Sequence, residues 1–573
     1  MHVVTNKIRR GEKEYTATLL RRSYREDGKV KKETLANLSH LPAEAIDAIR
    51  RVLAGETLLS AEDAFEIERS LPAGHVNAAL VMARRLGLAE FLDRAPSRQR
   101  DLCMAMIVSR VISPGSKLST IRTLGQSTLA SELGVPGADE DDLYEAMDWL
   151  FSRQDRVEDR LAKRHLKDGE MVLYDVSSSY FEGRSCPLGK LGYSRDAQKG
   201  LPQIIYGLLC DPEGRPVAVE VFSGELHDDK TLPSQVSKIK DRFGLAAVTV
   251  VADRGMVTKA NIETLASADG VSWITALKSP TIKKLVRDGV FQPSLFDDQN
   301  LGEITDPENF PGERLIVCRN PLVGAQRARK RSELLDATDA ELAAIKTRVD
   351  KGTLLGAAQI GMAVGPALKR FYVKKHFEIT ITDMEFSYAR KQAEIDEEAA
   401  LDGFYILRTN HTAADVPAGD VVRAYKNLEQ AERAFRSLKG PELQIRPIHH
   451  HLEDRVRAHV FLCMLAYYLE WHMRQRLAPM LYDDTDKDAG EAQRSSIVAK
   501  AERSLAAVTK QTTGRTEDGL PVHSFRTLLD DLATLTRNTL VTAIAPDHPF
   551  TLLARPTPVQ QRARELLGLS RTQ

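Results

Sequence analysis

The run Met171-Val-Leu-Tyr-Asp-Val176 marks the point in the chain at which the spacing of apolar residues changes. Before it, apolar residues recur three and four positions apart, as in 102–112, which is typical of packed helices. After it, two apolar runs, 203–210 and 216–222, flank the turn Asp211-Pro-Glu-Gly214 and predict a β-hairpin. A sheet is therefore expected to begin at residue 171.

Helices and strands alternate beyond the hairpin. The expected elements are helices over 231–243 and 258–267, and strands over 246–252, 272–277 and 404–409. Before the last strand lies a long stretch without this alternation, which contains a charged helical run, 326–351, and a strand-like segment, 371–381. With that stretch removed, the order is strand, hairpin, helix, strand, helix, strand and helix, which is the order of the ribonuclease H-like fold.

We therefore expect an α/β protein whose ribonuclease H-like catalytic core is interrupted by an insertion domain, with mostly helical N-terminal and C-terminal regions. A chain of 573 residues exceeds what one hydrophobic core usually supports, so several domains are expected. The expected domains are a basic strand and helix region (1–58), a helical region that is a candidate for DNA binding (59–168), the first part of the core (169–280), the insertion domain (281–401), the second part of the core (402–475) and a helical C-terminal region (476–573).

Tyr425, Glu432 and Lys439 recur at seven-residue spacing in a run that is predicted to be one helix. At about 100° per residue, seven steps return to within about 20° of the starting direction, so the three side chains share one face. The face presents one acid between two groups that can bind phosphate.

Two aspartates each stand at the end of an apolar strand-like run, Asp175 in Leu173-Tyr-Asp175 and Asp253 in Val250-Val-Ala-Asp253. In the expected sheet these strands are neighbours, so the aspartates would meet, and Glu432 could join them from its helix. Phosphodiester cleavage can use two hard cations roughly 4 Å apart, and magnesium and manganese prefer oxygen ligands. The three carboxylates are thus candidate ligands for two Mg²⁺ or Mn²⁺ ions. An aspartate at a strand end is also a common helix cap or turn residue, so the pattern alone leaves a structural role open.

The three acids stand in motifs that resemble the acidic triad of bacterial insertion-sequence transposases of the DDE class. The motifs are Tyr-Asp175-Val-Ser-Ser-Ser-Tyr-Phe-Glu-Gly, Val-Ala-Asp253-Arg-Gly-Met and Glu432-Arg-Ala-Phe-Arg-Ser-Leu-Lys. The similarity extends through Gly192-Tyr-Ser-Arg-Asp196 and Asp402-Gly-Phe-Tyr-Ile-Leu-Arg-Thr-Asn410. The resemblance thus spans most of the chain.

The last helix resembles the branch of these transposases in which tyrosine, arginine, glutamate and lysine follow one another with two, three and six residues between them. Tyr425, Glu432 and Lys439 match in type and spacing, whereas Leu428 stands at the arginine position. Arg436, one turn after Glu432, is the candidate to supply the missing cation. The stretch 281–401 then corresponds to the insertion domain of this branch.

The resemblance implies metal-dependent cutting at the ends of a mobile element, a hairpin intermediate and strand transfer into target DNA. It implies that Asp175, Asp253 and Glu432 are catalytic metal ligands and that Tyr425, Lys439 and Arg436 bind DNA. It also implies double-stranded DNA as the partner, both element ends and target, held by a homodimer. Two alternatives stay open: a ribonuclease H-like metal-dependent nuclease that only hydrolyses, and a non-enzymatic DNA-binding protein derived from a transposase.

Three other features of the sequence are weaker candidates for a functional site. Trp273 lies in an apolar strand and is expected in the core. His449, His450 and His451 are consecutive, and three adjacent side chains on a helix cannot converge on one metal ion. Ser177-Ser-Ser179 has no partner histidine in a hydrolase pattern.

Charge and composition set outer limits. Lys and Arg number 80 and so do Asp and Glu, which argues against coating of nucleic acid by bulk charge. The basic residues of 1–58 alternate with acidic ones, so this region fits either a solvated face or a DNA-backbone contact surface. Its pattern predicts strands, a turn at Asp27-Gly28 and a short helix before Gly55.

The five cysteines form no Cys-x-x-Cys pair, so neither a zinc ribbon nor a disulfide framework is supported. No apolar run approaches the roughly 20 residues of a membrane helix. We expect a cytoplasmic, nucleoid-associated protein without a membrane partner.

Overall fold

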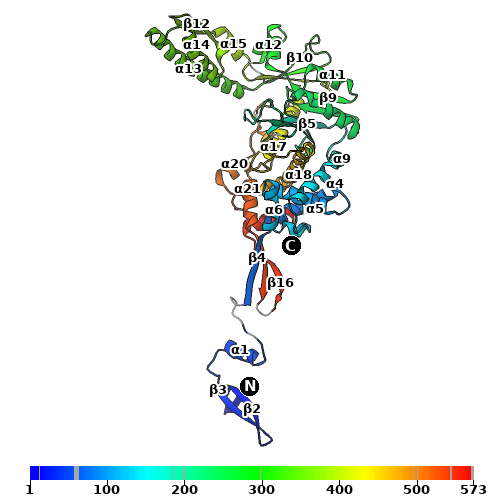
Figure 1. The fold of residues 1–573 in the computed structure, drawn as a ribbon, viewed down its shortest axis with the longest axis vertical. Coiled ribbons are helices and arrows are strands. Elements are labelled where there is room, and N and C mark those ends of the chain that lie inside the picture. Colours follow the sequence, from blue (N-terminus) through cyan, green and yellow to red (C-terminus); the bar gives the residue numbers. More distant parts are fainter. Residues whose placement is uncertain are drawn as a thin grey trace. The chain divides into compact units, whose positions relative to one another are not determined.

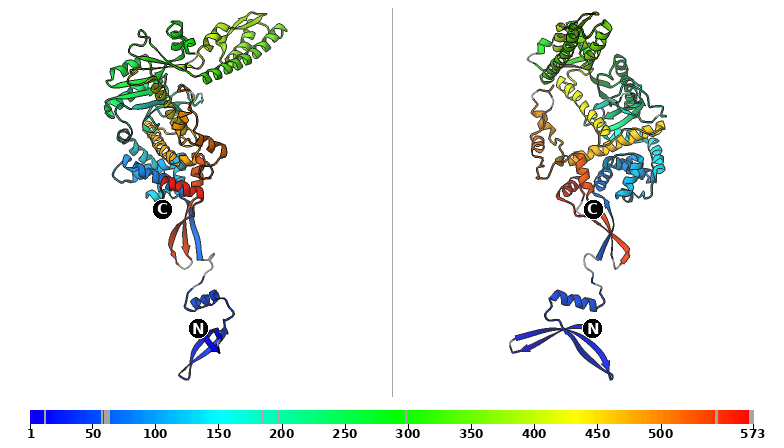
Figure 2. Two further views of the ribbon diagram at one scale, coloured as in Figure 1. Left: turned by 180° about the vertical axis from the view of Figure 1, so that it is seen from behind. Right: turned by 60° about the vertical axis from the view of Figure 1, so that its left-hand side comes forward.

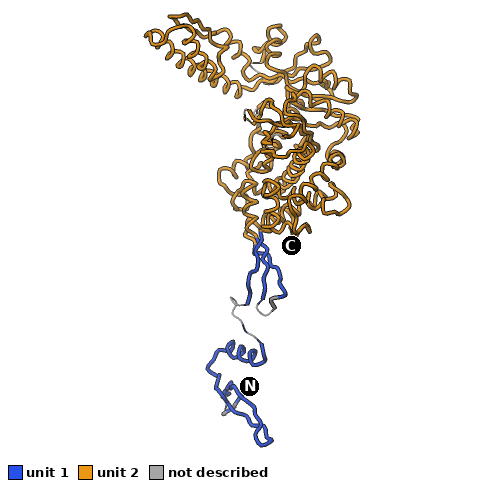
Figure 3. Tube along the Cα trace, viewed as in Figure 1, with its two compact units in different colours: residues 1–71, 536–555 blue, residues 72–535, 556–573 orange. Residues whose placement is uncertain are grey.

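The computed structural model describes residues 1–11, 13–56, 58, 64–183, 185–196, 198, 200–296, 299–494, 496–499, 501–542 and 545–569. These residues form two compact units, which are coloured separately in Figure 3. The first comprises 1–71 and 536–555, and the second comprises 72–535 and 556–573. Segments far apart in the sequence therefore build each unit.

The first unit contains two three-stranded sheets and one helix, α1 (Ala43–Leu53). One sheet is made of β1 (His2–Arg10), β2 (Lys13–Glu26) and β3 (Lys29–Asn37). The predicted turn between β2 and β3 is confirmed: Asp27 and Gly28 have φ of 48° and 72°, as Asp-Gly hairpin turns require.

The other sheet of this unit is built from β4 (Phe65–Pro72), β15 (Thr536–Thr542) and β16 (Ala545–Leu553). The sequence analysis expected helices in 59–168 and 476–573 and missed these strands. Most of β4 is exposed, so it lacks the alternation of apolar and polar residues that indicates a half-buried strand. Its partner strand lies more than 450 residues away, and local sequence carries no signal for such a pairing.

The second unit begins with helices, as predicted. They are α3 (Gly74–Leu86), α4 (Leu88–Leu92), α5 (Arg98–Ile112), α6 (Lys117–Gln126), α7 (Leu129–Leu133), α8 (Glu140–Phe151) and α9 (Gln154–His165). The core of this region is α5, which is buried from Leu102 to Ile112 and packs on α3, α8 and the long helix α18 (Glu453–Leu477). Figure 1 shows these blue helices gathered beside α18.

An eight-stranded mixed sheet forms the centre of this unit. Its strands are β5 (Met171–Tyr180), β6 (Gln203–Cys210), β7 (Pro216–Ser223), β8 (Val248–Ala252), β9 (Val271–Ala276), β10 (Leu301–Ile304), β11 (Arg314–Arg319) and β14 (Phe404–Thr409). Their order is β10-β11-β14-β9-β8-β5-β6-β7, with β5, β8 and β9 parallel and the other neighbours antiparallel. All residues of β6 and β8 are buried, which explains why both read as continuous apolar runs.

Helices connect the strands of this sheet and cover it. They are η1 (Asp228–Lys230), α10 (Leu232–Ser237), η2 (Lys238–Arg242), α11 (Lys259–Ser267), α12 (Ser279–Arg287), η3 (Pro293–Phe296), α16 (Ala418–Lys426) and α17 (Leu428–Lys439). α17 packs on β5 and β6, and α18 packs on β7. Trp273 is only 4% exposed, so its predicted place in the core is confirmed.

Residues between β11 and β14 form a separate group of elements with their own apolar core. They are α13 (Pro321–Asp350), α14 (Ala357–Arg370), η4 (Lys374–His376), β12 (Phe377–Ile381), β13 (Phe386–Arg390) and α15 (Gln392–Ala399). Figure 2 shows them together in light green. The strand-like segment 371–381 is a strand only from Phe377 onward. β10 and β11 also lie in the stretch that was expected to interrupt the sheet, yet they pair into it beside β14.

The remaining C-terminal elements of the second unit are short helices. They are η5 (Ala478–Met480), α19 (Lys487–Ala492), α20 (Leu505–Thr513), α21 (Phe525–Ala533) and α22 (Pro558–Leu567). None of the helices in the described ranges is long and apolar enough to span a membrane.

Candidate functional site

Asp175 and Asp253 lie side by side in the central sheet. Strands β5 and β8 are parallel, and their register pairs Tyr174 with Ala252. The next residue on each strand path is an aspartate, so the two carboxylates leave the sheet at neighbouring positions. Gly207 on β6 makes room for the side chain of Tyr174, because a Cβ at that position would lie 2.2 Å from the Tyr174 hydroxyl.

Glu432 approaches the same place from α17, which packs on β5. Burial, followed by the charges of Asp253 and Glu432, raises the pKa of Asp175 to about 7. Such repulsion requires the three acids to be close together. In the described part of the chain none of them has an ion-pair partner: Asp175 accepts a hydrogen bond from the Val176 N–H at 2.8 Å.

The expected single helix from Tyr425 to Lys439 is wrong in one respect. It is broken at Asn427, which ends α16 and precedes α17, so Tyr425 and Glu432 belong to different helices. The Asn427 N–H donates to the carbonyls of Arg423 and Ala424, closing the first helix there.

The two expected phosphate-binding groups already have acidic partners. The Tyr425 hydroxyl donates to Asp253 at 3.4 Å, and burial together with that carboxylate raises the pKa of Tyr425. The Lys439 ammonium donates to Asp196 at 2.9 Å, and burial lowers the pKa of Lys439. Tyr425 therefore lies directly beside the carboxylates, while Lys439 belongs to a cluster around Asp196.

Leu428 and Arg436 lie on different faces of α17. Leu428 is 7% exposed and belongs to the main core, whereas Arg436 is exposed. Position 428 thus points away from solvent in this chain, and an arginine there would have to leave the core to reach a phosphate. Arg436 has no ion-pair partner among the described residues.

Sequence reasoning assigned no role to two ion-paired clusters beside the three acids. Arg195 pairs with Asp228 and its charge acts on Asp175, while Asp196 is buried and pairs with both Lys439 and Arg446. The available signal was the motif Gly192-Tyr-Ser-Arg-Asp196. Ser178 fixes this motif by accepting a hydrogen bond from the Arg195 N–H at 3.0 Å, which gives the serine run a structural role.

The three acids offer the oxygen donors that Mg²⁺ and Mn²⁺ prefer, and their mutual repulsion favours a bound cation. Their donor set therefore fits a divalent ion. Their side chains do not converge, however: in the part of the chain that the structure describes, no three His, Cys, Asp or Glu side chains form a group that could hold an ion.

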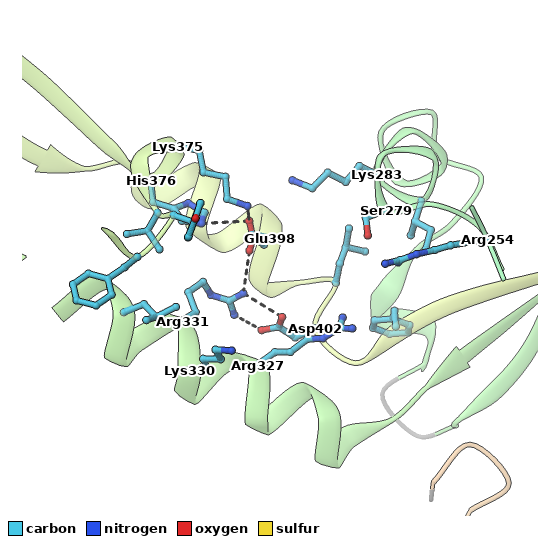
Figure 4. Close-up of a pocket in the computed structure, with 17 residues that line it drawn as sticks. Arg254, Ser279, Lys283, Arg327, Lys330, Arg331, Lys375, His376, Glu398 and Asp402 are labelled. Carbon is cyan, nitrogen blue, oxygen red and sulfur yellow. Dashed lines mark hydrogen bonds and ion pairs between the residues drawn. The ribbon is translucent and has the colours of Figure 1, made fainter. Parts of the chain in front are cut away.

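A basic groove of about 500 Å³ is lined by Arg254, the residue that follows Asp253 in the chain (Figure 4). Its labelled basic residues are Arg254, Lys283, Arg327, Lys330, Arg331, Lys375 and His376. The two acids that line it, Glu398 and Asp402, are paired with Lys375 and Arg331. Arg254, Arg327 and Lys330 have no ion-pair partner in the described ranges, so the groove carries uncompensated positive charge beginning one residue after Asp253.

Comparison with known proteins gives two family matches. A family described as the transposase DDE domain matches residues 172–469, and the N-terminal domain of the IS1634 family transposases matches residues 2–66. Among solved structures, a similar chain is that of the cryo-EM structure of the piggyBac transposase synaptic complex with hairpin DNA. The identity is 7%, and the match covers 80% of this chain and 76% of that chain. The TM-score of 0.35 is too low to show a shared fold. No curated protein matches the chain.

The first family match spans more than half of the chain and contains Asp175, Asp253 and Glu432, so the chain belongs to the insertion-sequence transposases of the DDE class.

Proposed function

We propose that this transposase cuts DNA at the ends of a mobile element and transfers those ends into target DNA, through a hairpin intermediate. The observation that carries the proposal is that three acids lie near one another: Asp175 and Asp253 follow adjacent parallel strands, and the charge of Glu432 acts on Asp175 from α17. A site of this kind needs a substrate or cation that neutralises its charge.

We propose a ribonuclease H-like core for the catalytic part. The support is the strand order β7-β6-β5-β8-β9, in which the first three strands are antiparallel and β5, β8 and β9 are parallel. The separate apolar core between β11 and β14 supports an insertion domain. The domain limits expected from the sequence, from 1–58 to 476–573, are part of the same proposal.

Asp175, Asp253 and Glu432 would hold two Mg²⁺ or Mn²⁺ ions. When bound, the ions would activate an attacking oxygen and stabilise the leaving oxygen of a phosphodiester. Tyr425 orients Asp253 through its hydroxyl, and Arg195 supplies positive charge near Asp175. These contacts keep the carboxylates placed before substrate arrives.

We propose that DNA runs along the basic groove beside Asp253. Arg254 would contact a phosphate next to the cleavage point, and Arg327 and Lys330 would follow the strand along α13. The other side of the same DNA would be contacted by Tyr425, Lys439 and Arg436. For Lys439 this contact requires a phosphate to replace Asp196 as its partner. A homodimer would hold two element ends, and the protein would act in the cytoplasm at the nucleoid.

Cleavage of DNA that carries the element ends tests the proposal. We expect Glu432→Gln to abolish cleavage in Mg²⁺ and to leave end binding intact. Glu429→Gln, on the exposed side of the same helix, is the matched control and should cleave normally. Undiminished cleavage by Glu432→Gln would remove Glu432 from the site.

The products separate the proposal from its alternatives. Hairpin-ended products on a denaturing gel support transposition chemistry. Open ends alone indicate a nuclease that only hydrolyses, and binding without cleavage by the unaltered protein indicates a non-enzymatic DNA-binding protein.

A further inference from the structure

A second cavity, of about 550 Å³, lies beyond the C-terminal end of α17, the helix that carries Glu432. The segment 444–452, which connects α17 to α18, forms one wall, and the start of α6 forms another. Arg110 and Lys117 point into it from the helical region. The cavity therefore joins the region before the sheet to the segment that follows Glu432.

The cavity wall is positively charged and has no acid. Its lining includes Arg110, Lys117, Arg446 and Arg455 together with four histidines, and neither Asp nor Glu is among the described lining residues. Arg446 and Arg455 are paired with acids outside the cavity. The other two cations are Arg110 and Lys117, and a buried charge without an acidic partner is costly.

Lys117 is 5% exposed, and within the described ranges its ammonium has neither a hydrogen-bond nor an ion-pair partner. Burial, followed by the charge of Arg110, lowers the pKa of Lys117 to about 7. Arg110 is also 5% exposed and donates only to the carbonyls of Leu443 and Gln444, at 3.5 and 3.4 Å. Two buried cations thus share one cavity without an anion.

The first turn of α6 adds further donors to the same cavity. Ser116 caps this helix by accepting a hydrogen bond from the Ser119 N–H. The N–H groups of Lys117 and Leu118 have no partner in the described structure, and the positive end of the helix dipole lies there. The buried Nδ1 of His459, on the opposite wall, likewise has no hydrogen-bond partner. Cationic side chains and free N–H groups at a helix start are the combination that binds phosphate.

We propose that this cavity binds a phosphate group, held by Lys117, Arg110 and the first turn of α6. The phosphate could belong to a DNA backbone or to a small phosphate compound, since both present the same charged oxygens. A DNA source rests on the proposed function; the cavity itself does not.

Titration of the full-length protein with inorganic phosphate, at ionic strength held constant with potassium chloride, tests the site. We expect saturable binding that Lys117→Met weakens about tenfold or more, because a hydrogen bond between charged groups is lost. Lys117→Arg keeps the charge and should retain binding. Unchanged phosphate affinity in Lys117→Met, or no saturable binding by the unaltered protein, would overturn the proposal.

Lys510→Met is the matched control, because Lys510 is equally buried but donates to the carbonyls of Ala478, Leu481 and Asp483. It should lower stability and leave phosphate binding unchanged. Unfolding curves of each variant show that it is folded during the titration.

Binding of duplex DNA at several salt concentrations identifies the source of the phosphate. If Lys117→Met reduces the slope of log affinity against log salt by about one, the ligand is a DNA phosphate. If the slope is unchanged while phosphate binding is lost, the site takes a small phosphate compound. Failure of the unaltered protein to bind DNA would count against the proposed function and leave the phosphate titration as an independent test of the cavity.

Discussion

Replacing Asp175 with asparagine should stabilise the metal-free protein although it removes a residue of the proposed active site. The carboxyl has a pKa of about 7 in the folded chain and an ordinary value of 3.8. Above pH 7 it is charged in both the folded and the unfolded state, so the full cost of its burial and repulsion is present. As the pH falls below 7, the folded state takes up a proton and the cost shrinks; it is gone below the ordinary value.

The shift sets the size of this effect. Each pKa unit is worth about 1.4 kcal/mol, which gives an upper limit of about 4 kcal/mol at pH 8. Asp175 is only half-buried, and screening by water should roughly halve this, so we expect about 2 kcal/mol. Asparagine has nearly the same shape and can still accept the hydrogen bond of the Val176 N–H.

Urea unfolding measures the difference. In chelator at pH 8, Asp175→Asn should be the more stable protein; at pH 5 its advantage should fall to about one third. Excess Mg²⁺ should reduce or reverse the advantage, because an ion held by the native carboxylates stabilises only the unaltered protein. Asp93→Asn is the control with the opposite sign, because hydrogen bonds from the Ala95 N–H and from Arg153 hold the pKa of Asp93 below its ordinary value. A less stable Asp175→Asn in chelator at pH 8 would refute the argument from repulsion.

Substitutions at three further buried positions are each measured by urea unfolding. Leu428→Arg, which restores the arginine of the family pattern, should cost about 3 kcal/mol because it puts a charge into the core; a stability unchanged from that of the parent would show that the side chain escapes to solvent. Glu470→Ala should cost about 2 kcal/mol, because it removes the closest carboxylate of the half-buried Arg474 and leaves it, among the described residues, only Glu442 and Asp483, at 3.6 and 3.8 Å; Glu470→Gln should cost less. For Lys117, the unfolded chain keeps its proton between pH 7 and 10.5 while the folded chain releases it, so stability rises with pH in that window. The unaltered protein should gain about 1 kcal/mol relative to Lys117→Met from pH 8 to pH 9, and a constant difference would contradict the buried, unpaired ammonium.

The features of the fold that could be predicted are those with a local signal. β6 and β8 are buried on both faces and read as apolar runs, and Gly244, with φ of 70°, ends a helix where the sequence indicated an end. The pairing of β4 with β15 has no such signal, because it joins segments at opposite ends of the chain, of which β4 is mostly exposed and β15 is half-buried along its whole length. The break at Asn427 was missed because the apolar spacing continues across it.

The candidate site likewise contains residues that the sequence could predict and contacts that it could not. Asp175 and Asp253 could be identified because each ends an apolar run, and the parallel register of β5 and β8 then brings them together. The partner of Lys439 could not be predicted, because Asp196 lies 243 residues earlier in an irregular segment, and the second cation on Asp196, Arg446, lies beyond the end of the helix. Helical periodicity shows which side chains share a face, and it gives no information about the loops that meet that face.

Charged groups of opposite sign lie on either side of α17, and the loops before and after it supply several of them. At one end, Asp175 and its neighbouring acids carry uncompensated negative charge; at the other, Lys117 and Arg110 carry uncompensated positive charge. The buried carboxylate of Asp196 pairs with Lys439 from α17 and with Arg446 from the cavity wall, so it connects this helix to the cavity. A DNA strand with bound cations would neutralise both ends at once, whereas a cation alone or a phosphate alone would neutralise one.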